Sequence, residues 1–310
     1  MKKPLVSIIM NCYNGEEFLR QAIESVIAQT YSNWEIIFWD NASNDLSAEI
    51  AKSYNCNLRY FKSENTTSLG AARDLALSFC EGDFIAFLDV DDIWLPDKLS
   101  CQIPYFNNPK TGLVNSKTIF FSDKNDSIEI SHAKKKVPTG NIFPNLMENY
   151  FLAIDSVIFR KKVLTNILGD FWFNKNLYYA EEADFFMRIS YNWDLEYCPE
   201  ILSKHRYHPN NLTKFSGKLI FNEDKIILNS LLILVPDLKI RFPSSVLKYQ
   251  GRIAYHECLY LWKTEKQKKA RQIIYPYVKN SIKYLCIYLL TFFSYSVFEF
   301  LKKNNIKFLK

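Results

Sequence analysis

The sequence contains few glycines and no glycine-rich phosphate loop. Eight of its 310 residues are glycine, and none stands in the GxGxxG or GxxxxGK(S/T) spacing that places backbone amides around phosphate groups. This absence argues against a dinucleotide-dependent dehydrogenase and against a P-loop enzyme. If the chain binds a phosphorylated ligand, it must hold the phosphates through a metal ion and through cationic side chains.

Cysteine motifs and a secretion signal are missing as well. The seven cysteines are widely spaced and form neither a CxxC pair nor a cysteine and histidine cluster with zinc spacing. This usage indicates reduced, mostly buried thiols in a cytoplasmic protein. The apolar run at residues 5–10 is too short for a signal peptide and ends at Asn11, so we expect a strand there.

Charge of one sign is not abundant. The net charge is +6, with 48% hydrophobic and 23% charged residues, which is the composition of a folded globular protein. The lysines of the last nine residues favour an anionic surface over nucleic acid as the partner of that end, and a solvated tail is the alternative. These lysines are Lys302, Lys303, Lys307 and Lys310.

Strand-like and helix-like segments alternate over the first hundred residues. Short apolar runs predict strands at 6–10, 35–39, 58–61 and 84–88, with helical spacing between them at 17–29, 48–54 and 69–79. This alternation predicts an α/β fold with a mostly parallel, Rossmann-like sheet flanked by helices. Further strands are expected at 112–121, 153–159 and 195–202, a loop at 122–138 and a helix at 180–191. We expect two domains, residues 1–215 and a helical extension at 216–310.

Three carboxylates follow the fourth predicted strand, at Asp89, Asp91 and Asp92. Close carboxylates repel one another and are costly to desolvate unless a cation lies between them. Turn formation or helix capping explains a single aspartate after a strand, but it does not explain this group of three. Since ligands of parallel sheets bind beyond the carboxyl ends of the strands, the sequence predicts a divalent cation there, Mg or Mn.

The sequence resembles glycosyltransferase family 2 in several separated motifs. The resemblance is carried by PLVSIIMNCYNGEEFLRQAIESVIAQTYSNWEIIFWDNASND, by LGAARDLALSFCEGDFIAFLDVDDIWLPDKL, and later by YYAEEADFFMRI and KHRYHPNN. It implies the GT-A fold and inverting transfer of a sugar from a nucleotide-diphosphate donor, preferably a UDP-sugar.

The resemblance also implies roles for individual residues of the donor site. Tyr13 would lie against the nucleobase, and Asp40 would accept a hydrogen bond from it. Arg73 would face the diphosphate and Asp89 the ribose, while Asp91 would bind the metal ion.

Later residues would complete the metal site and supply the base. His208 matches a histidine near the diphosphate and the metal, and Asp92 would have a supporting role. Glu182 stands where the family places its catalytic base, although the family commonly has an aspartate there. Glu181 and Asp184 are alternative bases, because on a helix these two share a face from which residue 182 turns away.

The segment 284–301 is apolar and aromatic, with Glu299 as its only charge. It is at the lower limit for a spanning helix, which needs about 20 residues. Its many aromatic residues suit the boundary between headgroups and acyl chains. We interpret it as a helix lying on the inner face of the cytoplasmic membrane, near a glycan or lipid-linked oligosaccharide acceptor. A spanning helix and a helix packed on the catalytic domain are the alternatives.

Together these features predict a metal-dependent glycosyltransferase that extends a bacterial cell-surface glycan such as O-antigen, capsule or lipooligosaccharide. An alternative is a catalytically inactive sugar-nucleotide or glycan-binding module of the same fold. A nucleotidyltransferase is disfavoured, because the segment NCYNGEEF after the first strand supplies no glycine-rich phosphate loop.

Overall fold

The computed structural model describes residues 3–122, 125–131, 136–208 and 217–303. The chain separates into two compact units. The first comprises Met1–Leu146 and Tyr150–Asn211, and the second comprises Met147–Asn149 and Leu212–Lys310. The domain boundary that the sequence predicts at residue 215 falls in the segment 209–216, which lies outside the described residues.

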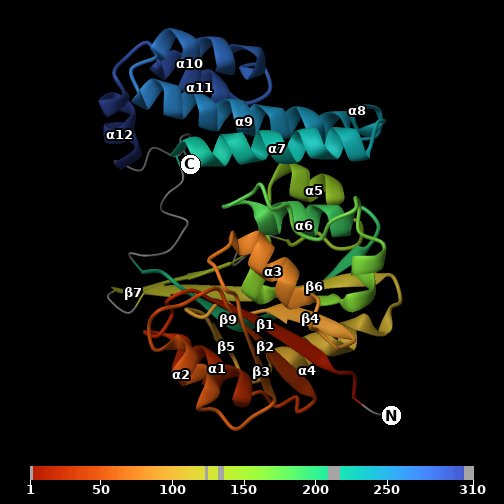
Figure 1. The fold of residues 1–310 in the computed structure, drawn as a ribbon. Helices are drawn as coiled ribbons and strands as arrows, with labels where there is room; N and C mark the ends of the chain where they lie inside the picture. Colours follow the sequence, from red (N-terminus) through yellow and green to blue (C-terminus); the bar gives the residue numbers. More distant parts are fainter. Residues whose placement is uncertain (1–2, 123–124, 132–135, 209–216, 304–310) are drawn as a thin grey trace. The chain divides into compact units, whose positions relative to one another are not determined.

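The first unit is built around one sheet, in which nine strands are found among the described residues (Figure 1). The strand order is β3-β2-β1-β4-β8-β6-β9-β5, and β7 pairs with β6. The first four strands are mutually parallel, as the alternation of the sequence predicts. They are β1 (Val6–Cys12), β2 (Trp34–Asp40), β3 (Leu58–Lys62) and β4 (Phe84–Phe87).

Helices connect these parallel strands and bury their apolar sides against the sheet. They are α1 (Leu19–Ile27), α2 (Ser47–Lys52) and α3 (Leu69–Leu77). In α1 the buried residues recur with the spacing of one helix face, and they share a core cluster with the buried side chains of β1. This packing fixes the carboxyl end of β1 beside those of β2 and β4.

The rest of the sheet is mixed. β8 (Ile158–Arg160) is antiparallel to β4 and to β6 (Thr111–Ser122), while β9 (Asp194–Arg206) runs parallel to β6. The two-residue strand β5 (Ile93–Trp94) pairs antiparallel with β9. The remaining helices of this unit include α4 (Lys98–Gln102), α5 (Phe143–Glu148), α6 (Glu181–Ser190) and 3₁₀ helices at Ile103–Asn107, Ile154–Ser156 and Lys161–Thr165.

Two expectations for this region were wrong in detail. The predicted loop at 122–138 contains β7 (Asn125–Ile130), which is antiparallel to β6. Among the described strands β7 pairs only with β6, and strands at a sheet edge often carry polar residues, so its sequence resembles that of a loop. The predicted strand at 153–159 begins instead with the 3₁₀ helix Ile154–Ser156 and becomes a strand only at β8.

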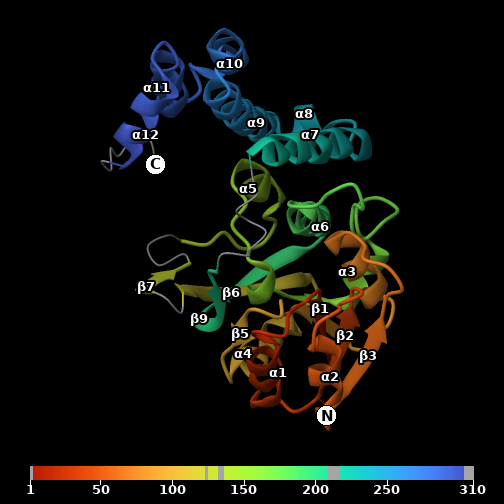
Figure 2. The ribbon, with the colours of Figure 1, turned by 60° about the vertical axis from the view of Figure 1, so that its left-hand side comes forward.

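The second unit is helical, which confirms the predicted extension. Its helices are α7 (Gly217–Leu234), α8 (Leu238–Arg241), α9 (Pro243–Lys263), α10 (Gln267–Ile274), α11 (Ile282–Leu290) and α12 (Tyr295–Lys303). Helices α7 and α9 lie side by side (Figure 2), and the Tyr249 hydroxyl donates to Asp224 Oδ1 between them at 3.0 Å. Trp262, Ile287 and Phe298 belong to the core formed by the later helices.

The prediction of one helix over residues 284–301 is wrong, because the segment is divided between α11 and α12. Side chains of neighbouring helices bind the backbone carbonyls where α11 ends. Arg271 donates to the carbonyl of Thr291, and Trp262 donates to that of Phe293, each at 2.9 Å. None of the helices in the described part of the chain has both the length and the apolar character needed to cross a bilayer.

Candidate active site

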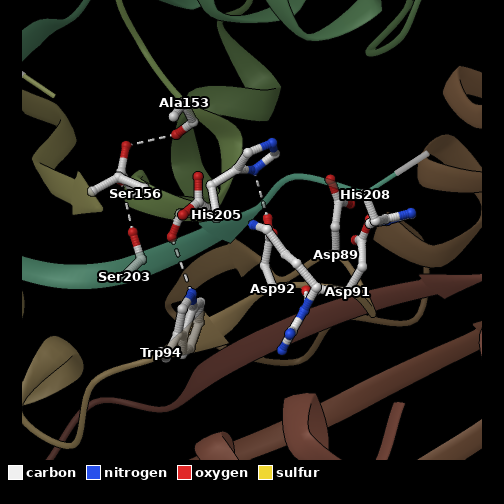
Figure 3. A network of polar contacts seen from close by, with 12 residues as sticks. Asp89, Asp91, Asp92, Trp94, Ala153, Ser156, Ser203, His205 and His208 are labelled. Carbon is white, nitrogen blue, oxygen red and sulfur yellow. Dashed lines mark hydrogen bonds and ion pairs between the residues drawn. The ribbon is translucent and has the colours of Figure 1, made fainter. Parts of the chain in front are cut away.

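The three carboxylates after β4 lie in one tight turn, which runs from Asp89 to Asp92. The amide of Asp92 donates to the carbonyl oxygen of Asp89 at 3.0 Å, which closes the turn. Each carboxylate then meets a different cationic or imidazole side chain. Asp89 meets an arginine of α3. Asp91 and Asp92 meet two histidines, one near the end of β9 and one just beyond it (Figure 3).

Arg73 of α3 is buried and holds two of the predicted site carboxylates. Its Nη2 lies 3.1 Å from Asp89 Oδ1, and its Nη1 lies 2.6 Å from Glu181 Oε1. Burial by itself would lower the pKa of Arg73, but the charges of Asp89 and Glu181 outweigh it and the pKa is raised. Arg73 therefore remains a cation and links α3, the turn after β4 and the start of α6.

The three carboxylates at the start of α6 have different surroundings. Glu181 pairs with Arg73, whereas Asp184 Oδ2 accepts from Arg188 Nε at 2.8 Å within the same helix. The side chains of Asp184 and Arg188 are both fully buried. Glu182 is therefore the candidate base that neither arginine binds directly among the described contacts.

Burial raises the pKa of Glu182 to about 8. The charge of Arg73 lowers this pKa, while the carboxylates of Glu181, Asp89 and Asp155 raise it further. A carboxyl group with a pKa near neutrality is well matched to accepting a proton in this range of pH.

Tyr150 is a neighbour of Glu182 that sequence reasoning missed. Burial, followed by the charges of Glu182 and Glu181, raises the pKa of Tyr150 well above its usual range. The phenol thus keeps its proton beside Glu182. No motif in the sequence distinguishes this tyrosine from the other 18 of the chain's 19.

The structure brings the predicted metal ligands Asp91 and His208 together. Asp91 Oδ2 lies 2.8 Å from His208 Nε2, although the two residues are 117 positions apart. Both side chains are partly exposed, and the ring of Phe18 packs on His208 with its centroid 5.2 Å away. The pair combines an oxygen and a nitrogen donor that remain open to solvent on one side.

Asp92 is turned inward, away from this pair. Its Oδ2 lies 3.0 Å from His205 Nδ1, and its Oδ1 accepts from the backbone amide of Arg206 at 2.9 Å. Burial would lower the pKa of His205, but the hydrogen bond and charge of Asp92 raise it to about 10. Asp155, a residue that sequence reasoning did not single out, also offers a carboxylate to this cluster.

The two residues expected at the nucleobase lie at the ends of β1 and β2. Tyr13 is exposed, as a stacking platform needs to be. Asp40 is fully buried, and its carboxylate accepts from the Ser43 amide at 2.7 Å and from the Tyr60 hydroxyl at 2.6 Å. Each carboxylate oxygen can accept more than one hydrogen bond, so these two contacts leave Asp40 able to accept another. Its hydrogen bond to a nucleobase stays a prediction.

Comparison with known protein families identifies a match over half of the chain. The model of the family described as glycosyl transferase family 2 matches residues 7–168. An uncharacterized glycosyltransferase of Methanocaldococcus jannaschii is 30% identical over 212 residues, which are 66% of this chain and 72% of that relative. The UDP-Glc:alpha-D-GlcNAc-diphosphoundecaprenol beta-1,3-glucosyltransferase of Escherichia coli is 41% identical over 100 residues, 32% of this chain and 40% of its own.

Solved structures show a similar fold at low sequence identity. S. aureus TarS 1–349 in complex with UDP-GlcNAc has a TM-score of 0.62 at 17% identity and covers 92% of this chain and 90% of its own. The mannosyltransferase PcManGT from Pyrobaculum calidifontis, in complex with GDP-Man and Mn²⁺, has a TM-score of 0.56 at 14% identity, with 82% and 75% coverage. The likeness to TarS confirms the predicted GT-A fold.

Replacing Asp184 should lower the stability of the fold more than it lowers the activity. We expect Asp184→Asn to lower the free energy of unfolding by about 3–5 kcal/mol, because Arg188 would be left as a buried, uncompensated charge. Urea unfolding measures this loss. The matched control is Asp237→Asn, since Asp237 and Arg241 form the same i, i+4 pair at the surface; there the loss should stay below about 1 kcal/mol. A variant of unchanged stability but without activity would identify Asp184 as the base.

Proposed function

Because this chain belongs to glycosyltransferase family 2 and is thus a transferase, we propose that it moves a sugar, with inversion, from a UDP-sugar to a hydroxyl of a growing bacterial cell-surface glycan. The observation that carries this proposal is the contact of Asp91 with His208 beyond the carboxyl end of β4. The UDP-GlcNAc bound by TarS supports the donor class, and the name of the E. coli relative supports a glycan acceptor.

The donor set at Asp91 and His208 fits a divalent cation. A carboxylate oxygen and an imidazole nitrogen are both ligands of Mn²⁺, and a carboxylate with water also suits Mg²⁺. The side chains are 26% and 17% exposed, which leaves room for donor phosphates to complete the coordination. When bound, such a cation supplies charge stabilisation for the leaving diphosphate. The Mn²⁺ of the PcManGT complex supports this assignment.

The remaining donor contacts follow from the elements that surround this pair. Asp89 is 31% exposed, so its carboxylate can accept from the ribose hydroxyls while Arg73 holds it in place. Arg73 also places positive charge beside the site of the diphosphate. Tyr13 would stack on the nucleobase, and Asp40 would accept from it at the end of β2.

Glu182 is the proposed base that removes the proton of the acceptor hydroxyl as it attacks the anomeric carbon. General-base catalysis contributes about 10²- to 10⁴-fold. The contacts of Glu181 with Arg73 and of Asp184 with Arg188 favour Glu182 over these alternatives.

A hydrophobic surface of the second unit supports contact with a membrane. We define the apolar stripe as the exposed residues Ile282, Leu285, Leu289, Phe292, Phe293, Val297 and Phe300. Ile282, Leu285 and Leu289 recur at the spacing of one face of α11, and Val297 and Phe300 at that of one face of α12. Phe292 and Phe293 lie in the turn between the two helices, while Ile287 and Phe298 are buried in the core. Lys279 and Lys302 are exposed near the two ends. An apolar face with flanking cations fits a lipid surface with anionic headgroups, on the cytoplasmic side of the inner membrane.

Removal of the metal should abolish donor hydrolysis. We expect the purified protein to hydrolyse one UDP-sugar slowly with Mn²⁺ or Mg²⁺, and Asp91→Asn to reduce that rate by roughly a hundredfold or more, because the leaving diphosphate loses its counter-charge. Chelator should have the same effect on the unmodified protein. Asp97→Asn, an exposed carboxylate nearby in sequence, is the control and should keep the rate. Absence of both hydrolysis and UDP binding would favour the inactive module.

The rate of hydrolysis should rise with pH as Glu182 loses its proton. The deprotonated carboxylate is the base, and a bound cation favours that form, so the midpoint should lie at or below about 8 and above the ordinary value of about 4.3. Glu182→Gln should remove this rise and about 10²- to 10⁴-fold of the rate. Glu182→Asp should retain the pH dependence. A full pH profile in Glu182→Gln would show that another group is the base.

The apolar stripe should bind anionic vesicles. We expect cosedimentation with mixed phosphatidylcholine and phosphatidylglycerol vesicles, and weaker cosedimentation with phosphatidylcholine alone. The triple variant Leu289→Ser, Phe292→Ser, Phe293→Ser should pellet several-fold less, since each inserted side chain contributes about 1.5–3 kcal/mol. Ile233→Ser with Ile240→Ser is the control, because both isoleucines are exposed elsewhere in the same unit. Equal pelleting of both variants would exclude the stripe as the membrane contact.

A further inference from the structure

We propose a second divalent-cation site in the first unit, formed by Asp92, Asp155 and His205. The three residues come from the turn after β4, the 3₁₀ helix Ile154–Ser156 and the end of β9. One ligand atom from each lies within 4.8 Å of the others. Ligands of one Mg²⁺ or Mn²⁺ are separated by no more than roughly 4.2 Å, given metal–oxygen distances of about 2.1 Å. Small side-chain movements would therefore close the site.

Asp155 is the residue that points to a missing ligand. It is fully buried, and neither of its carboxylate oxygens has a hydrogen-bond partner among the described residues. A buried carboxylate without a partner is strongly unfavourable, and buried charges are ordinarily paired or coordinate metals. A cation shared with Asp92 and His205 would remove this cost.

The backbone carbonyls of Asp155 and of the next residue are held by side-chain donors. Trp94 Nε1 donates to the carbonyl oxygen of Asp155 at 3.0 Å (Figure 3). Gln102 Nε2 donates to the next carbonyl, that of Ser156, at 2.9 Å. The Ser156 hydroxyl donates to the carbonyl of Ala153, the residue before this short helix, at 2.6 Å.

Charge balance favours a cation over the side chains already present. The buried ammonium of Lys98 donates to Gln102 Oε1 at 2.6 Å, and no ion pair joins it to Asp155 in the described contacts. His205 contacts Asp92, and neither His205 nor Lys98 makes a hydrogen bond to Asp155 in the described contacts. A divalent cation shared by Asp92 and Asp155 would balance both carboxylates.

This site is distinct from the proposed donor site and does not depend on a nucleotide. Its ligands are buried or largely buried, whereas Asp91 and His208 are partly open. The two sites share one structural element, since Asp91 and Asp92 are consecutive. A cation on Asp92 would therefore fix the turn that presents Asp89 and Asp91 to the donor.

The test is Mn²⁺ binding by the full chain without nucleotide, measured by calorimetry and by the electron paramagnetic resonance of free Mn²⁺. The unmodified protein should bind one Mn²⁺, and Asp155→Asn should bind it at least tenfold more weakly while giving the same circular dichroism. In Asp91→Asn the ion at Asp92, Asp155 and His205 should still bind. The second ion, which binds to the unmodified protein at Asp91 only when UDP is added, should be lost. His205→Gln is a second disruptive variant, and His256→Gln of the second unit is its control.

Two results would overturn the proposal. One is Mn²⁺ binding of equal strength in Asp155→Asn and the unmodified protein. The other is no Mn²⁺ binding without UDP, which would leave Asp155 as an acid held in the interior without a metal. If UDP adds no second ion while the first still depends on Asp155, the proposed donor site fails and this cation site stands.

Discussion

The guanidinium of Arg73 is the interaction on which the arrangement of the site depends. It is buried and contacts Asp89 at 3.1 Å and Glu181 at 2.6 Å, so one side chain joins α3, the turn after β4 and the start of α6. Removing one partner of such a buried group leaves an uncompensated charge, which is more costly than never forming the contact. The three segments are therefore held in one relative position by a single residue.

This constraint also decides which carboxylates of α6 remain available. Successive helix residues point about 100° apart, because 3.6 residues complete a turn. Once Glu181 is bound to Arg73, Glu182 must point in another direction, and Asp184 is held by Arg188. The sequence motif contains three carboxylates, but ion pairing leaves only Glu182 without a direct arginine contact among those described.

Hydrophobic periodicity and motifs in the sequence predicted the parallel half of the sheet and part of the candidate site. The alternation of apolar runs and helical segments predicted β1 to β4 and their helices, and the resemblance brought Asp91 and His208 into one hypothesis. Asp155 could not be predicted, because a lone aspartate beside apolar residues has no distinguishing spacing. The prediction of one helix over residues 284–301 was wrong, since the carbonyls at the break accept from Arg271 and Trp262 of other helices, which the apolar pattern of the segment does not encode.

The contact of Asp92 with His205 follows from strand register. The antiparallel pairs of β5 and β9 are Ile93 with Lys204 and Trp94 with Ser203. Continued by one residue, this register sets Asp92 opposite His205, where the hydrogen bond is found. Continued by another, it sets Asp91 opposite Arg206, whose Nε donates to the Asp91 carbonyl at 3.0 Å.

A slip of one residue in this short pairing would set Asp92 opposite Lys204 or Arg206, and side chains would change faces because they alternate along a strand. Asp92 would then lose His205, and the buried cluster with Asp155 could not form. β9 is held in place by its long parallel pairing with β6, which extends from Thr111 with Asp194 to Phe121 with Arg206. The longer pair thus fixes the position of β9, and with it the place of His205, the residue that Asp92 contacts.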